Sequence, residues 1–210
     1  MVAKRRYRPM PKGIVLTPEQ QAERREKIVA VALSLMAENG FQKTSMREIA
    51  VLANMGKSSL YYFFITKDEI VVYAVEKEIE KTIQQVHRII DGEPSPQQCL
   101  RKIMLNHLRF PEQYRTVLMW LNTESDYLEE EYRKRLKDAR YAYQDIIKSV
   151  IDNGVTTGIF RKTDTALVTR LLINSMLSIS YTSRPLDSSE KMLDETMNIF
   201  LHGIMNDGGE

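Results

Sequence analysis

The chain has 210 residues, of which 43% are hydrophobic and 28% charged, a balance typical of a folded globular protein. No apolar run approaches the roughly 18 residues that a membrane-spanning helix needs, and the basic first residues lack the apolar segment of a secretory signal. A single cysteine, Cys99, excludes an internal disulfide and a cysteine-based metal cluster, and the three histidines share no metal-ligand spacing. We therefore expect a cytoplasmic protein with no membrane partner, no metal and no other cofactor.

Positive charge is concentrated at the front of the chain. Residues 1–70 hold 12 Lys or Arg against 7 Asp or Glu, whereas residues 71–210 hold 18 against 21. A basic front on a mildly acidic body indicates that the front meets a polyanion. Residues 1–18 mix five cations with prolines and a glycine, which predicts a flexible basic arm. This arm either reaches into a DNA minor groove or is a disordered solubilising tail.

The pattern becomes helical from Thr17. This threonine suits a helix cap, Pro18 suits the first helical position, and apolar residues then recur at helical spacing until Asn39-Gly40 ends the helix. Ser45 and Glu48 have the spacing of a capping box, which opens a short second helix.

Further helices follow in close succession. A third is expected from about Lys57 to Phe64, and Thr66 with Glu69 forms a second capping box, which opens a long helix to about Ile90. Beyond Pro96 the pattern predicts helices over 97–109, 112–122, 126–152, 164–183 and 187–205, separated by breaks at 110–111, 153–158 and 184–185. No stretch alternates as a strand does. The sequence therefore predicts an all-α protein of about nine helices.

Residues 45–64 have the features of a helix-turn-helix. Ala50 is small where the two helices must touch, and Asn54 tolerates the left-handed conformation of the turn. Leu60 and Phe64 share one face of the last helix by i,i+4 spacing. The opposite face offers a cation, a hydroxyl and two phenols, the groups that bind phosphates and base edges, in Lys57, Ser58, Tyr61 and Tyr62.

The same region carries four motifs in one register. They are Glu38-x-Gly40-Phe41, Thr44-Ser45, Ile49-Ala50-x-x-Ala53-Asn54 and Leu60-Tyr61-Tyr62-x-Phe64-x-x-Lys67-x-x-Ile70. Together they resemble the N-terminal signature of the TetR family of transcriptional regulators. Two positions depart from that signature: Gly56 replaces the usual serine cap of the recognition helix, and Phe63 replaces a His or Tyr that often reaches a phosphate. Glycine is an acceptable helix cap, so the first departure changes detail more than role.

The resemblance implies a domain organisation and a set of DNA contacts. Residues 1–18 would form the arm, 19–80 the DNA-binding domain, and 81–210 a helical domain for effector binding and dimerisation. Lys67, at the positive end of the fourth helix, would anchor a phosphate. The full set of implied contacts to double-stranded operator DNA is Thr44, Ser45, Arg47, Lys57, Ser58, Ser59, Tyr61, Tyr62 and Lys67.

The C-terminal domain would bind both a second copy of the chain and a ligand. In the family the last two helices pair with those of a partner, and their apolar stripes here exceed what one small core needs. The predicted homodimer interface consists of Leu167, Leu171, Leu172, Ser175, Met176, Ile179, Met192, Thr196, Ile199 and Phe200. The candidate ligand pocket, apolar with a few polar tips, consists of His87, Met104, His107, Phe110, Met119, Trp120, Tyr127, Tyr141 and Tyr143.

Three classes of function compete. The first is a dimeric, nucleoid-associated repressor that a small hydrophobic or acyl-type effector releases from a palindromic operator. The second is an architectural or cell-division DNA-binding protein on the same fold, without small-molecule sensing. The third is a helical enzyme, which no catalytic triad, phosphate loop or metal spacing supports.

Overall fold

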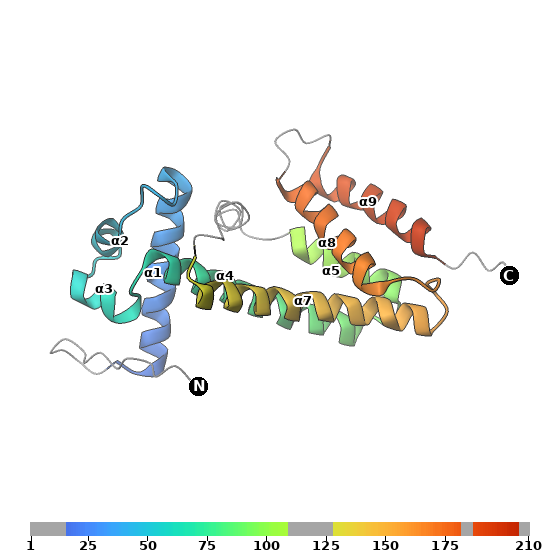
Figure 1. Ribbon diagram of the computed structural model, residues 1–210, viewed down its shortest axis with the longest axis horizontal. Helices are drawn as coiled ribbons and strands as arrows, with labels where there is room; N and C mark the ends of the chain where they lie inside the picture. Colours follow the sequence, from blue (N-terminus) through green and yellow to red (C-terminus); the bar gives the residue numbers. More distant parts are fainter. Residues whose placement is uncertain (1–15, 109–127, 182–186, 206–210) are drawn as a thin grey trace. The chain divides into compact units, whose positions relative to one another are not determined.

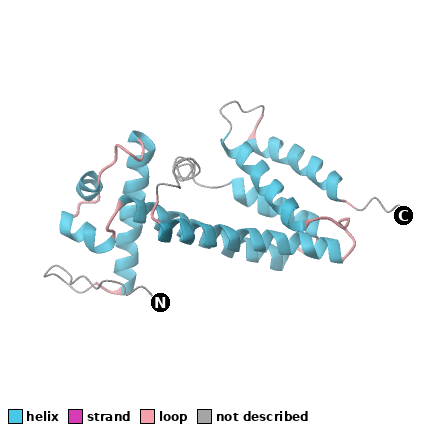
Figure 2. Ribbon diagram, in the orientation of Figure 1, coloured by secondary structure: helices cyan, strands magenta, loops and turns pink. Residues whose placement is uncertain are grey.

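The computed structural model of the protein describes residues 16–108, 128–181 and 187–205, and these are helices joined by short loops (Figures 1 and 2). The helices are α1 (Pro18–Asn39), α2 (Met46–Leu52), α3 (Lys57–Phe63), α4 (Lys67–Gly92), α5 (Pro96–Leu108), α7 (Glu130–Thr156), α8 (Thr165–Tyr181) and α9 (Ser189–Ile204). The predicted all-α class is confirmed over these ranges, while the helix expected at 112–122 lies outside them. None of the described helices combines the length and the apolar character needed to cross a membrane.

The chain divides into two compact units, and the division falls inside α4 and α7. The first unit comprises Met1–Val75 and Glu112–Arg135, and the second comprises Glu76–Pro111 and Leu136–Glu210. The first unit therefore contains α1, α2, α3 and the beginning of α4. The sequence places a domain boundary at residues 80–81, a few residues beyond the division in α4, and assigns the first residues of α7 to the second domain.

Local interactions begin and end α1 at the residues that the sequence predicts. The Thr17 hydroxyl accepts the N–H of Gln20 at 3.3 Å, and the Gln20 side chain accepts the N–H of Thr17 at 3.0 Å. Gly40 ends the helix with φ 83° and donates its N–H to the Met36 carbonyl at 2.9 Å. Its ψ of 155° lies outside the left-handed helical region, so the end differs in detail from the expected cap.

The predicted capping box at the start of α4 is only half formed. The Thr66 hydroxyl accepts the N–H of Glu69 at 3.0 Å, as a cap should. The Glu69 carboxylate accepts the N–H of Ile65 at 2.7 Å, where a complete box would take that of Thr66. Ile65 lies in the short connection after α3, and the carboxylate binds its N–H there.

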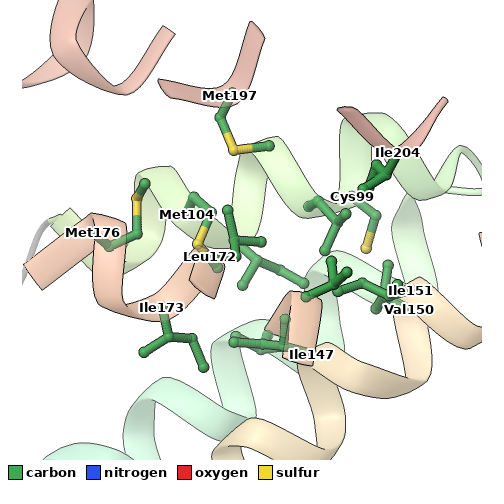
Figure 3. Close-up of a cluster of buried hydrophobic side chains, with 14 of the residues drawn as sticks. Cys99, Met104, Ile147, Val150, Ile151, Leu172, Ile173, Met176, Met197 and Ile204 are labelled. Atoms are coloured by element: carbon green, nitrogen blue, oxygen red, sulfur yellow. The ribbon is translucent and has the colours of Figure 1, made fainter. Parts of the chain in front are cut away.

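One apolar core holds the second unit together, and α4, α5, α7, α8 and α9 all contribute to it. Figure 3 shows Cys99 and Met104 of α5, Ile147 of α7, Leu172 of α8 and Met197 of α9 among its side chains. Burial, followed by the charge of Glu93, raises the pKa of Cys99 to about 11, so the thiol stays protonated as a small apolar group. Fully burying one Leu, Ile or Met side chain in this core contributes about 1.5–3 kcal/mol to the stability of the fold.

The predicted helix break at Asn153-Gly154 is wrong, because α7 continues to Thr156. Gly154 is buried, and a Cβ built on it would overlap the ring of Phe160. The chain turns at Gly158, with φ 74°, and returns so that the Phe160 N–H reaches the Gly154 carbonyl at 2.9 Å. Gly154 therefore permits close packing inside a helix, and Gly158 makes the turn.

Candidate nucleic-acid interface

The turn between α2 and α3 has the geometry of a helix-turn-helix. Asn54 has φ 54° and is the one non-glycine residue with positive φ in the described ranges, as its place in the turn predicts. The Met55 N–H donates to the Ala50 carbonyl at 2.9 Å, which closes the turn. Ala50 and Ala53 are buried where the helices meet. These contacts fix α3 as a short helix held beside α2.

The seven residues of α3 separate into a buried face and an outward face. Leu60 and Phe63 are buried, and Phe64, directly after the helix, joins them. The opposite face presents the four side chains that the sequence places there. Lys57 and Ser58 are exposed, and Tyr61 and Tyr62 are half-buried.

Side chains on the outward face of α3 also contact one another and the residues beside them. The Lys57 Nζ lies 5.8 Å from the centre of the Tyr61 ring, and Tyr62 packs edge-on against Phe63 with ring centres 5.1 Å apart. Ser59 is half-buried, between the two faces. Gly56 caps the helix without any side-chain hydrogen bond, as expected for a glycine. This face therefore combines one cation, hydroxyl groups and aromatic edges over a buried apolar base.

The start of α2 offers fewer contacts than the sequence suggests. Ser45 and Glu48 form the predicted capping box, and hydrogen bonds from Ser45 lower the pKa of the Glu48 carboxyl. Arg47 is exposed. Thr44, in contrast, is only 3% exposed and donates its hydroxyl to the Gly40 carbonyl at 3.0 Å. We therefore remove Thr44 from the candidate DNA contacts, because its side chain points into the protein.

Lys67 has partners within the protein where the sequence suggests a DNA phosphate. Its Nζ donates to the carbonyls of Phe41, Gln42 and Thr44 at 2.7, 3.2 and 3.3 Å and lies 4.3 Å from the centre of the Phe41 ring. An ammonium group has three protons, so these acceptors match its full donor capacity. Burial lowers its pKa, while the charge of Asp68 opposes that shift. We therefore also remove Lys67 from the candidate contacts; it fastens α4 to the loop before α2.

Sequence reasoning missed the role of Arg25 of α1. Its guanidinium donates to the Phe63 carbonyl at 3.2 Å and lies 5.2–5.8 Å from the ring centres of Phe63, Phe64 and Tyr73. A signal was present, since Arg25 precedes the buried Ile28 by three positions and so continues the buried stripe of α1. A cation in the register of an apolar stripe indicates a specific internal partner.

An open groove runs beside the turn of the helix-turn-helix. Arg24 and Lys27 of α1, Asn54 and Met55 of the turn, and Leu16 are among the residues that line it. Residues 1–15, the basic arm of the sequence analysis, lie outside the described residues.

In the second unit, two of the candidate pocket residues form a polar pair. His107 Nδ1 lies 3.1 Å from the Tyr143 hydroxyl, and the rings stack with centres 5.8 Å apart. Burial lowers the pKa of His107 to about 4 and raises that of Tyr143, so both side chains are neutral near pH 7. Met104, on the same helix as His107, is fully buried in the core.

Other pocket candidates do not join this pair. His87 lies on the exposed side of α4, and Tyr141 is 51% exposed on α7, with the Lys137 Nζ 5.5 Å from its ring centre. The prediction of these two residues as pocket lining is wrong, because each lies on the solvent side of its helix. The remaining candidates fall outside the described residues: Phe110, Met119, Trp120 and Tyr127.

The predicted dimer residues divide between the core and the surface. Leu172, Met176 and Ile179 are buried in the core of the second unit, so the prediction that they face a partner is wrong. The apolar stripe of α8 is wide: one edge of it packs into the core, and the other edge is exposed to solvent. Leu167 and Leu171, each 52% exposed, and Ile199, 74% exposed, are large apolar groups on the surface. Four further candidates are partly buried: Ser175, Met192, Thr196 and Phe200.

Matches to known sequence families cover most of the described residues. Residues 28–74 match the family described as "Bacterial regulatory proteins, tetR family". Residues 93–204 match the family described as "Tetracyclin repressor-like, C-terminal domain". Together the matches include α2, α3, α5, α7, α8 and α9 in full.

Individual proteins show the same similarity. The chain is 26% identical over 203 residues to the HTH-type transcriptional repressor KstR2 of Mycolicibacterium smegmatis, covering 92% of this chain and 97% of the relative. The fold of this chain is similar to that of FadR from Bacillus subtilis in complex with stearoyl-CoA, with a TM-score of 0.74 and 15% identity. The match covers 85% of this chain and 98% of FadR. A third similar structure is AibR in complex with isovaleryl coenzyme A and operator DNA, with a TM-score of 0.68, 20% identity and coverage of 84% and 97%.

Proposed function

Because the chain belongs to the TetR family of bacterial regulatory proteins, we propose that it is a dimeric transcriptional repressor that binds a palindromic operator and is released by a small ligand. The observation that carries this proposal is the outward face of α3, which presents Lys57, Ser58, Tyr61 and Tyr62 over a fully packed base. In a two-fold dimer the two copies of α3 would enter successive major grooves about 34 Å apart. Such a protein acts in the cytoplasm, beside the DNA, and needs no catalytic activity.

The proposed contacts fall into two kinds. Lys57 and Ser58, on the first turn of α3, are suited to base edges, while Tyr61 and Tyr62 are suited to phosphates or a thymine methyl. Ser45 and Arg47 would meet the DNA backbone from the start of α2, although the Ser45 hydroxyl is already engaged with Glu48. Ser59, being half-buried, would contribute less.

DNA selection tests the recognition surface directly. A duplex is first selected from a random-sequence library with the wild-type protein, and affinities for this duplex and a scrambled one are then compared. Tyr61→Ala should weaken binding to both duplexes, because phosphate contacts do not depend on sequence. Lys57→Ala should reduce the preference for the selected duplex by about tenfold, since a good base contact is worth about 1–3 kcal/mol. Lys81→Ala, on an exposed position of α4 in the second unit, is the control. Unchanged affinities in both α3 variants would refute the assignment.

We propose that the dimer forms through the exposed edges of α8 and α9. Support comes from Leu167, Leu171 and Ile199, which are large apolar groups exposed on the two helices that the family uses for pairing. The double variant Leu171→Glu, Ile199→Glu should sediment as a monomer and bind the selected duplex poorly, since one short helix buries little DNA surface. Tyr141→Glu, at a position on α7 that is as exposed as Leu171, should remain a dimer. A dimer that persists in the double variant would place the interface elsewhere.

We propose an acyl-coenzyme A thioester as the effector. Two proteins of similar fold were crystallised with stearoyl-CoA and with isovaleryl coenzyme A. The His107–Tyr143 pair places two neutral hydrogen-bonding side chains beside the apolar core of the second unit, and the carbonyl of a bound thioester would need such a polar point. Stearoyl-CoA, isovaleryl-CoA and free coenzyme A would be titrated into the complex with the selected duplex. Release by an acyl form but not by free coenzyme A is expected; no release by any of them would favour the non-sensing DNA-binding protein.

The long helix α4 is the proposed link between ligand and DNA. It begins in the first unit, directly after α3, and continues into the second. A ligand that tilts this helix would change the separation of the two copies of α3. By thermodynamic reciprocity, the selected duplex must then weaken ligand binding by the same factor as the ligand weakens DNA binding. Measuring both factors with one acyl-CoA tests the link.

A further inference from the structure

Arg25 lies where three helices of the first unit meet. It projects from α1, its guanidinium donates to the carbonyl of Phe63, the last residue of α3, and the Tyr73 ring of α4 lies 5.6 Å from it. The ring of Phe64, the residue that ends α3, lies 5.2 Å away. One side chain of α1 therefore contacts both the end of α3 and the beginning of α4.

The end of a short helix needs such a partner. The carbonyls at the end of a helix lack an internal donor. In α3 the Leu60 carbonyl accepts the N–H of Phe64 at 3.0 Å, which leaves the carbonyls of the last three residues, Phe63 among them, without a donor inside the helix. A cation at the C-terminal end also interacts favourably with the helix dipole. A helix this short is not stable by itself in water, so its direction is set by its neighbours. Arg25 supplies a hydrogen bond, a charge and aromatic contacts at the same point.

We propose that Arg25 is a positioning residue for DNA recognition, which fixes the direction of α3 by holding its C-terminal end against α1 and α4. This inference rests on the proposed function. A seven-residue helix is about 10 Å long, so a tilt of about 10° displaces its far end by about 2 Å. Hydrogen-bond distances span only about 0.5 Å, so such a tilt breaks base contacts at the first turn, where Lys57 and Ser58 lie.

The chemistry favours arginine over lysine at this position. A planar guanidinium donates to a carbonyl in its plane while its faces lie against aromatic rings, whereas an ammonium is a point charge on a flexible stem. Arg25→Lys therefore retains the charge and loses the geometry. Arg25→Gln removes the charge as well. Arg88→Gln removes the same charge from an exposed position of α4 in the second unit and serves as the control.

The test compares affinities for the selected duplex and for a scrambled duplex, each at several salt concentrations, below the melting temperature of every variant. Arg25→Gln should reduce the preference for the selected duplex by about tenfold or more, while its scrambled-duplex affinity and salt dependence match those of Arg88→Gln. Arg25→Lys should lose part of the preference and keep the wild-type salt dependence. A purely structural role would lower the melting temperature and leave the preference unchanged.

Two results would overturn the inference. One is an unchanged preference in both Arg25 variants while they are folded. The other is an equal loss on both duplexes with a reduced salt slope, which would mean that Arg25 touches a phosphate. If Arg25→Gln does not fold, Arg25→Lys alone decides between these results. A wild-type protein that fails to distinguish the two duplexes would instead contradict the proposed function.

Discussion

Replacing Lys67 separates two roles that the sequence and the structure give to the same side chain. The substitution Lys67→Met keeps the apolar stem against Phe41 and removes the ammonium group. The carbonyls of Phe41 and Thr44 are part-buried and lose a charged donor, whereas that of Gln42 is exposed and can bind water instead. Hydrogen bonds to charged groups contribute about 1.5–3 kcal/mol each, and relief of the desolvation that lowers the pKa of Lys67 offsets part of the loss. We expect a net loss of about 1–3 kcal/mol.

Urea and thermal unfolding measure this loss. For a chain of this length, about 2 kcal/mol corresponds to a melting temperature lower by roughly 4–8 °C. Binding to the selected and scrambled duplexes is then measured at several salt concentrations on folded protein. Because Lys67 faces inward, its loss should leave the salt slope at the value of Lys81→Met, an exposed control on the same helix.

The opposite pattern would refute this reasoning. A salt slope lowered by about 1 relative to the control, with unchanged stability, would show that the ammonium leaves the three carbonyls and binds a phosphate when DNA arrives. Lys67 would then regain the role that the family resemblance implies.

Three further predictions concern the second unit. Burial lowers the pKa of His107 from 6.5 to about 4, so the unfolded chain takes up a proton before the folded protein does as the pH falls. The free energy of unfolding should therefore drop by up to about 3 kcal/mol between pH 6.5 and 4, and urea unfolding across this range should show that His107→Gln lacks this drop. Gly154→Ala should destabilise by about 1–3 kcal/mol or more, because its Cβ overlaps an aromatic ring, whereas Gly203→Ala, which meets open space in α9, should not; equal melting temperatures would contradict the packing. Leu172→Ala should cost about 2–5 kcal/mol and leave the protein dimeric, since this side chain is fully buried in its own core; sedimentation and unfolding together check this.

Short-range features of this fold could be predicted from the sequence because their interactions lie within a few residues. The caps at Thr17 and Ser45 each involve a partner three positions away, and the positive φ of Asn54 follows from its place between two short helices. The division of α3 into two faces follows from helical periodicity alone. The amino-acid sequence by itself therefore determined the class of the fold, the helix-turn-helix and the residues on its outward face.

Tertiary structure decided what each side chain meets when its partner is distant in sequence. Lys67 lies 26 residues from Phe41, and Arg25 lies 38 residues from Phe63, yet each pair shares a hydrogen bond. Which edge of the α8 stripe is buried depends likewise on where α5 and α9 pack, so Leu171 is exposed while its neighbour Leu172 is enclosed. Periodicity gives the direction of a side chain relative to its own helix. Only the packing of several helices determines whether that direction leads to solvent, to a carbonyl or to the core.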